Sequence, residues 1–194
     1  MKKTVSLIAA VAFYLMAPGL PAQTNCAPAG GVSFVCGPTN AEDLVLVPDT
    51  DWIVSSGMAA GSGFYLIDAD SGEWRSLETA VRHDASMFPA CAAPPPASEF
   101  ESHGLNIRTT GADRAMLYVV GHGAREAIEV FEVDSAGARP TLTWRGCVML
   151  PEGLAANSVA SFADGSIVAT ILLMPGKTFA DSVAKEPTGA VVRW

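Results

Sequence analysis

Two of the three histidines of this chain, His103 and His122, flank a segment whose pattern predicts a β-hairpin. A β-rich run follows His103, turn residues at 111–113 interrupt it, and a second β-rich run ends at His122. In a hairpin centred near Ala112, the two histidines are expected about opposite each other, with Cα atoms roughly 4.5–5.5 Å apart. Neighbouring imidazoles, one orienting or relaying protons for the other, suit general-base chemistry near neutral pH. The alternative interpretation is a polar hairpin end that faces solvent.

The first 22 residues are predicted to be a secretory signal peptide. Lys2 and Lys3 precede an apolar stretch at residues 5–16, and residues 20–22 resemble a small-residue cleavage site. The apolar stretch is too short to span a bilayer comfortably, and no later segment is long and apolar enough to be transmembrane. We therefore expect a periplasmic or secreted protein.

The chain is acidic, with a formal net charge of −8 at pH 7. Removal of the signal peptide makes it more acidic, because that segment contains two lysines and no acidic residue. This charge argues against binding of nucleic acid or anionic membrane surfaces, and it fits calcium or a neutral small molecule better.

The four cysteines, Cys26, Cys36, Cys91 and Cys147, are predicted to form disulfides. An even number in an exported protein favours disulfides over zinc, and there is no Cys-x-x-Cys pair. Three connectivities are open, of which we favour Cys26–Cys36 with Cys91–Cys147.

The rest of the chain shows short β-rich runs between Gly, Pro and Asp residues, which predicts an all-β sandwich or propeller. A Pro-rich stretch at 92–97 is expected to be an extended linker between groups of strands. The β-rich runs are 44–47, 52–55, 64–68, 105–109, 116–120, 128–133, 142–149, 159–162, 167–172 and 190–194.

A weak internal repeat favours the propeller over the sandwich. Three times a polar position, Glu42-Asp43, His103 or Asn157, comes just before a strand, a turn and a second strand. Repeats of about 40–50 residues are typical of propeller blades, and longer loops would lengthen them. Since the inner strand of every blade begins at the same face, these residues are expected to converge at one mouth of the channel, together with His122.

Glu42, Asp43 and Asn157 form an all-oxygen set that suits calcium. A calcium ion there can polarise an ester or lactone carbonyl while His103, helped by His122, deprotonates the attacking water. Taken singly, Glu42-Asp43 can also be a solvated strand start and Asn157 a turn residue.

Several segments together resemble the paraoxonase/arylesterase group. These are residues 40–44 (Asn-Ala-Glu-Asp-Leu), 52–57, 103–105 (His-Gly-Leu), 117–122 followed by 128–131, and 150–157 ahead of 163–165. The chain looks like the N-terminal half of this six-bladed, calcium-dependent propeller superfamily, which includes gluconolactonase-like and strictosidine synthase-like proteins. The resemblance implies an all-β partial propeller, about half of six four-stranded antiparallel blades. Residues 42–194 would form it after an N-terminal arm at 23–41.

By position, the resemblance implies that Glu42 and Asn157 match ligands of a catalytic calcium. Asp43 and the backbone carbonyl of Leu105 would match ligands of a structural calcium, and His103 and His122 a histidine dyad. The sequence departs from the family pattern at Ser158, where an Asp is expected.

The function predicted from these residues is calcium-dependent hydrolysis of small lactones or aryl esters. The remaining calcium ligands of such enzymes come from later blades, so further blades or a second chain are expected to close the ring. The alternative is a non-catalytic propeller segment that binds a ligand or partner.

Overall fold

The computed structural model describes residues 26–194, which divide into two units at residue 34. In the first unit, Ala29 and Val32 exchange two backbone hydrogen bonds of 3.0 Å around a turn. The predicted signal peptide, residues 1–22, lies outside the described residues. No helix of the described residues is long and apolar enough to cross a membrane.

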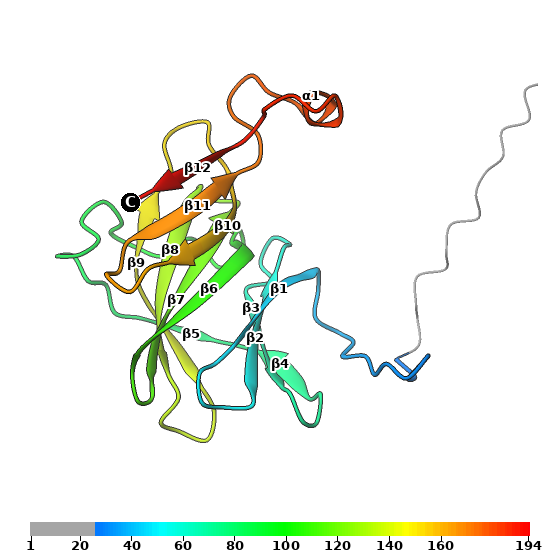
Figure 1. Cartoon of the computed structure of the whole chain (residues 1–194). Helices are drawn as coiled ribbons and strands as arrows, with labels where there is room; N and C mark the ends of the chain where they lie inside the picture. The colour runs from blue at the N-terminus through cyan, green and yellow to red at the C-terminus, as the bar shows by residue number, and fades with distance from the viewer. Residues whose placement is uncertain (1–25) are drawn as a thin grey trace, which may run out of the picture. The chain divides into compact units, whose positions relative to one another are not determined.

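The second unit, residues 35–194, is built from three β-sheets and the short helix α1 (Phe179–Val183) (Figure 1). The first sheet has the order β1 (Ala41–Leu46), β2 (Trp52–Gly57), β3 (Phe64–Asp68) and β4 (Trp74–Ser76). The second has the order β5 (Thr79–Val81), β9 (Thr141–Met149), β8 (Ala127–Asp134), β7 (Arg114–His122) and β6 (Glu101–Gly111). The third has the order β10 (Ala156–Ser161), β11 (Ile167–Ile171) and β12 (Ala190–Arg193).

Neighbouring strands pair antiparallel except at one edge, where β5 lies parallel to β9. The predicted all-β class is therefore confirmed, and every strand expected from the sequence is present. The sequence pattern missed β4, β5 and α1. All residues of β4 and β5 are exposed, and α1 buries none of its residues. Elements without a buried face leave no hydrophobic period to detect.

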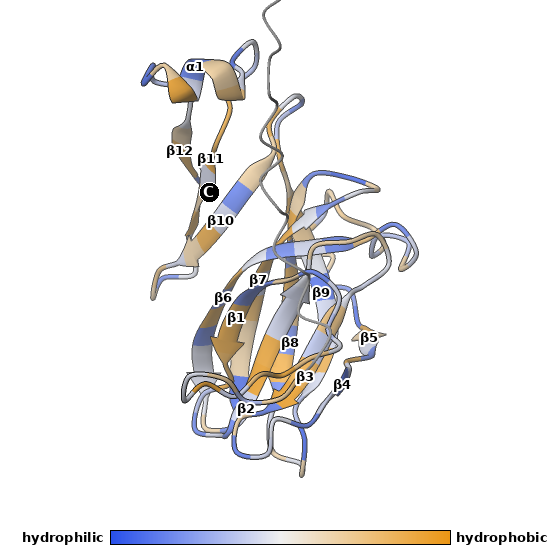
Figure 2. Cartoon of the chain, turned by 90° about the vertical axis from the view of Figure 1, so that its right-hand side faces the viewer, coloured by the Kyte–Doolittle hydropathy of each residue, from blue (hydrophilic) through white to orange (hydrophobic). Residues whose placement is uncertain are grey.

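Burial explains why some strands alternate and others are continuously apolar. β7 and β8 are buried along almost their whole length, so both their faces carry apolar residues, and Figure 2 shows the apolar colouring along β8. In β12, half-buried and exposed residues alternate, as expected for a strand with one packed face. Leu117, Val119, Ile128 and Trp144 are fully buried at the centre of the second sheet.

The three sheets contact one another through β1, β6 and β10, each the first strand of an antiparallel meander. β6 contacts β1 of the first sheet on one side and β10 of the third sheet on the other. β10 approaches β6 closely at Gly104, where a Cβ would lie 2.6 Å from the backbone oxygen of Asn157. The described residues form separate sheets and no closed ring.

A strap of residues 79–97 runs along the outer edge of the second sheet. It begins with β5 against β9, is fixed to β9 by the disulfide Cys91–Cys147, and ends in the Pro-rich stretch. The predicted pairing of Cys91 with Cys147 is thus confirmed, and Cys26 and Cys36 are also disulfide-bonded.

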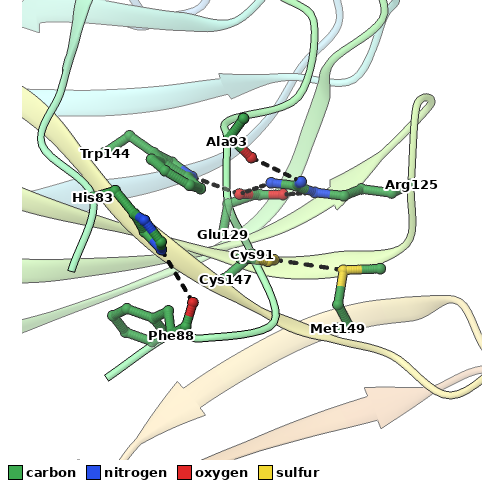
Figure 3. Close-up of a disulfide and its surroundings, with 9 residues drawn as sticks. All are labelled: His83, Phe88, Cys91, Ala93, Arg125, Glu129, Trp144, Cys147 and Met149. Carbon is green, nitrogen blue, oxygen red and sulfur yellow. Dashed lines mark hydrogen bonds and ion pairs between the residues drawn. A yellow bond between two sulfur atoms is a disulfide. The ribbon is translucent and has the colours of Figure 1, made fainter. Parts of the chain in front are cut away.

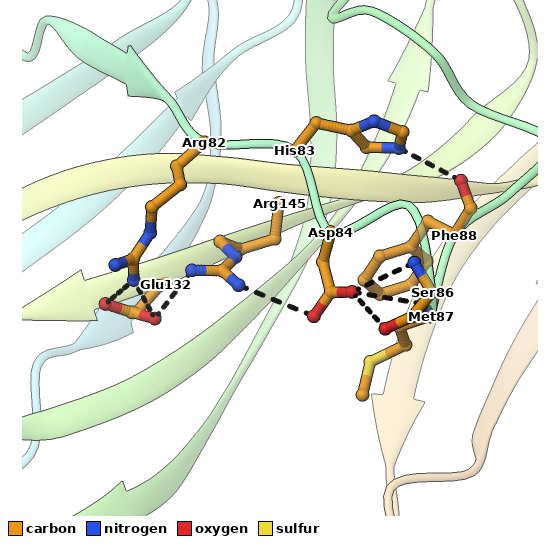
Figure 4. Close-up of polar contacts among 8 residues, drawn as sticks. All are labelled: Arg82, His83, Asp84, Ser86, Met87, Phe88, Glu132 and Arg145. Carbon is orange, nitrogen blue, oxygen red and sulfur yellow. Dashed lines mark hydrogen bonds and ion pairs between the residues drawn. The ribbon is translucent and has the colours of Figure 1, made fainter.

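Ion pairs hold the same strap to the sheet (Figure 4). Arg82 contacts Glu132 of β8 at 3.1 Å, and Asp84 contacts Arg145 of β9 at 3.4 Å. Arg145 also reaches Glu132 at 3.3 Å, so one glutamate joins the strap and both strands.

Candidate functional site

His103, near the start of β6, and His122, at the end of β7, lie side by side. Nδ1 of His103 is 3.1 Å from Nε2 of His122, and the ring centroids are 5.3 Å apart at an interplanar angle of 48°. The side chains are 9% and 14% exposed, respectively. The hairpin pattern therefore predicted the neighbouring imidazoles, and the interpretation of a solvated hairpin end does not fit their burial.

A β-bulge changes how the two histidines meet. His122 pairs with Glu101 and Gly121 with Ser102, whereas the next pair is Leu105 with Val119. The register shift falls on residues 103 and 104. His103 is thus not directly opposite His122, as a regular hairpin would place it, and the imidazoles approach each other diagonally. A bulge places one extra residue in one strand and thereby changes the direction of a side chain.

Carboxylates lie at both ends of this histidine pair. Oε2 of Glu126 is 2.7 Å from Nδ1 of His122, and Oε2 of Glu42 is 3.4 Å from Nε2 of His103. We call Glu126, His122, His103 and Glu42 together the histidine row. It links β1, β6, β7 and the turn that leads into β8.

Glu126 was missed by the sequence analysis. It follows His122 by four residues in the turn between β7 and β8, and its carboxylate folds back onto the imidazole. The sequence feature that could have predicted this contact is an acidic residue shortly after a histidine at the end of a strand.

Asp43 has a different environment from its neighbour Glu42, and the pairing of β1 with β2 shifts register between Ala41 and Leu44, where both residues lie. Its Oδ2 accepts the backbone N–H of Leu105 at 2.7 Å, and its Oδ1 accepts that of Leu44 at 2.8 Å. The side chain therefore ties β1 to β6 directly. The predicted structural-calcium role of Asp43 and the Leu105 carbonyl stays a prediction.

Asn157 lies exposed on β10, and its backbone oxygen faces Gly104, the neighbour of His103. The Glu42 side chain is 43% exposed and touches His103 from the other side. A carboxylate and an amide are hard oxygen donors, so the donor types fit calcium. Among residues 26–194, no three His, Cys, Asp or Glu side chains group in metal-binding geometry.

Open hollows border the site on two sides. One of about 440 Å³ includes Glu126, with Met149, Leu150 and Leu154 among its apolar walls. Another of about 400 Å³ includes Asn157 and residues of β11 and β12. A more enclosed cavity of about 520 Å³ between the second and third sheets contains Arg108 and none of the histidine row.

The most deeply buried charge belongs to a second carboxylate that the sequence analysis also missed. Glu129 is 1% exposed, accepts two hydrogen bonds from Arg125 at 2.7 and 2.9 Å, and accepts one from Trp144 Nε1 at 2.7 Å (Figure 3). Its oxygens are enclosed by these donors, so Glu129 has a structural role.

His83, the third histidine, is half-buried against the same cluster. Its ring stacks on Trp144 with centroids 5.5 Å apart, and its Nε2 lies 3.1 Å from the backbone oxygen of Phe88.

The chain was compared with known proteins. No protein-family model matches it, and no curated protein is significantly similar to it. The resemblance to the paraoxonase/arylesterase group therefore stays a prediction.

Proposed function

We propose that this protein hydrolyses small lactones or aryl esters with His103 as the general base and calcium as the cofactor. The observation that carries the proposal is the histidine row: two buried, hydrogen-bonded imidazoles with a carboxylate at each end. Such an arrangement suits removal of a proton from water near neutral pH.

In the proposed reaction, Nε2 of His103 takes a proton from a water molecule whose oxygen attacks the carbonyl carbon. The acyl C–O bond then breaks, and the proton held by His103 passes to the leaving alkoxide or phenolate. His122 supports the positive charge that His103 carries between the two steps. Glu42 and Asn157 would hold calcium, which when bound polarises the carbonyl and stabilises the oxyanion.

We further propose that residues 42–194 are part of a six-bladed propeller. Two features support this proposal. Each sheet contains an up-and-down antiparallel meander, and β6, the first strand of one meander, contacts β1 and β10, the first strands of the other two. Radial sheets that meet at their first strands are the architecture of propeller blades.

Export to the periplasm or beyond also belongs to the proposal. The disulfides are compatible with an oxidising compartment, where such bonds persist.

The test measures hydrolysis of phenyl acetate and δ-valerolactone by the purified protein, in calcium and in EGTA. We expect calcium-dependent turnover that His103→Gln lowers at least about 100-fold. We also expect Glu42→Gln to weaken calcium binding. His83→Gln is the matched control, because this third histidine lies outside the row.

The melting temperature in calcium and in EGTA separates the alternatives. If calcium raises it but neither substrate is hydrolysed, the chain is a calcium-binding segment without catalysis. If calcium has no effect and Glu42→Gln changes nothing, the metal proposal is overturned.

A further inference from the structure

The histidine row has more hydrogen-bonding contacts than two neutral imidazoles can fill with protons. Each neutral imidazole carries one ring N–H, so the pair supplies two protons. The row has three contacts: Glu126 with His122, His122 with His103, and His103 with Glu42. One contact must therefore lack a proton when both rings are neutral.

The distances show which contact that is. The Glu126–His122 contact is 2.7 Å and the His122–His103 contact is 3.1 Å, both within the normal range for hydrogen bonds. The contact of His103 Nε2 with Glu42 is 3.4 Å, beyond that range. A carboxylate 2.7 Å from a ring nitrogen without a proton would be repelled, so the proton lies at the Glu126 end.

We infer that Glu126 is a positioning residue that sets the direction of the row. Its carboxylate accepts Nδ1–H of His122, which leaves Nε2 of His122 as an acceptor for Nδ1–H of His103. Nε2 of His103 then keeps its lone pair, on the side that faces Glu42. Glu126 does not contact His103. Through His122, it nevertheless selects Nε2 of His103 as the nitrogen that acts as the base.

Burial strengthens this coupling. The His103 and His122 side chains are 9% and 14% exposed, so water competes little for the bond between them. Glu126 is 39% exposed, and its carboxylate remains solvated on its outer side. A carboxylate that accepts one ring N–H of a histidine, and so fixes its tautomer, is a common way to orient an imidazole.

The role of His103 Nε2 as the base depends on the proposed function, whereas the two tautomers do not. The tautomers can be measured by NMR of protein labelled with ¹⁵N-histidine, at a pH of about 8.5 where free imidazoles are neutral. The chain has only three histidines, and His83→Gln assigns the third signal. We expect both His103 and His122 to carry their proton on Nδ1.

Two variants test the part played by Glu126. Glu126→Ala removes the acceptor, so His122 and His103 should lose their preference for Nδ1–H. Glu126→Gln keeps a carbonyl acceptor at the same position and should restore the preference in part. Glu152→Gln, an exposed glutamate outside the row, should leave both tautomers unchanged.

The inference is overturned if His103 carries its proton on Nε2 in the wild-type spectrum, or if both of its nitrogens are protonated. This measurement uses wild-type protein alone, so it tests the inference even if the Glu126 variants fail to fold. Unchanged tautomers in folded Glu126→Ala would also overturn it.

If the tautomers are as expected but no ester or lactone is hydrolysed, the proposed function fails, and the inferred direction of the hydrogen bonds in the histidine row stands. If hydrolysis occurs, Glu126→Ala should lower kcat about 10-fold and change KM little.

Discussion

At the scale of residues, two carboxylates three positions apart, Glu126 and Glu129, have opposite consequences. Glu126 bonds one imidazole and keeps an exposed side, so a change at Glu126 is transmitted along the histidine row. Glu129 is enclosed by Arg125 and Trp144, so its charge is fully occupied in holding the second sheet together. Exposure and the number of donors distinguish the two, and neither is visible in the sequence.

The Glu129–Arg125 pair predicts a large loss of stability when its charge is removed. Glu129→Gln leaves the Arg125 guanidinium, whose side chain is only 21% exposed, without its counter-charge. Breaking a buried ion pair from one side costs about 3 kcal/mol or more. Urea denaturation should show this loss, whereas the exposed Glu152→Gln should change the free energy of unfolding by less than about 0.5 kcal/mol. A loss below about 1 kcal/mol for Glu129→Gln would show that the pair contributes little.

Asp84 predicts a component of the acid sensitivity. The Ser86 hydroxyl, the Met87 backbone N–H and the nearby Arg145 hold the pKa of this carboxyl below its ordinary value (Figure 4). Because the pKa is lower in the folded state, the stability from these contacts is complete above about pH 4. It is lost as the pH falls through the folded-state value.

Asp84→Asn should therefore flatten the acid limb of the stability profile, measured by urea midpoints from pH 2 to 6. Ser86→Ala should raise the pKa of Asp84 in an NMR titration, since it removes the largest cause. A steep, unchanged acid limb in Asp84→Asn would assign the acid sensitivity to other groups.

At the scale of elements, strand positions followed from the sequence, but their contacts did not. Alternation and turn residues predicted the β6–β7 hairpin, because local periodicity decides strand and turn. The bulge at residues 103–104 was not predicted, since an extra residue in one strand does not change the local apolar and turn pattern that predicts a hairpin. The strap was missed for a similar reason: β5 buries no residue, and its parallel pairing with β9 joins distant parts of the chain.

Gly104 predicts a specific cost at the contact of β6 with β10. A Cβ at this position would lie 2.6 Å from the Asn157 backbone oxygen and 2.8 Å from Ser158 Cα. Both atoms belong to the backbone, so Gly104→Ala must move a strand and should cost about 1–3 kcal/mol. The matched control is Gly137→Ala in an exposed turn, where the nearest atom is 3.7 Å away. Equal melting temperatures for the two variants would mean that β10 does not pack tightly on β6.

At the scale of the whole molecule, the sequence predicted that Glu42, His103 and His122 come together, and the structure places them in contact. The prediction used the repeated position of polar residues ahead of strands, a pattern that any radial arrangement of sheets preserves. The number of blades and the closure of a ring, which stay predictions, depend on how sheets pack over long distances. Such packing leaves little trace in local patterns.

The disulfide Cys91–Cys147 links the strap, which leads back into β6, covalently to β9. Cys91 and Cys147 are both buried, and the bond closes a loop of 56 residues. That loop contains β6, β7 and β8, and therefore His103, His122 and Glu126. The disulfide thus restricts the unfolded chain over the whole segment that carries the imidazoles.

Replacing both cysteines by alanine should consequently lower the free energy of unfolding by about 4 kcal/mol, from the loop-closure entropy of a segment of this length. The measurement is urea denaturation of the variant beside oxidised wild-type protein. Dithiothreitol treatment of both proteins is the control: it also reduces the bonds of Cys26 and Cys36, so the midpoints of reduced wild type and reduced variant should coincide. If the variant keeps the wild-type midpoint, the ion pairs of Arg82, Asp84 and Arg145 with their partners hold the strap without the disulfide. The tautomers of His103 and His122 in the folded variant should stay unchanged, because Glu126 bonds His122 directly and β7, which carries His122, pairs with β6 and β8 rather than with β9.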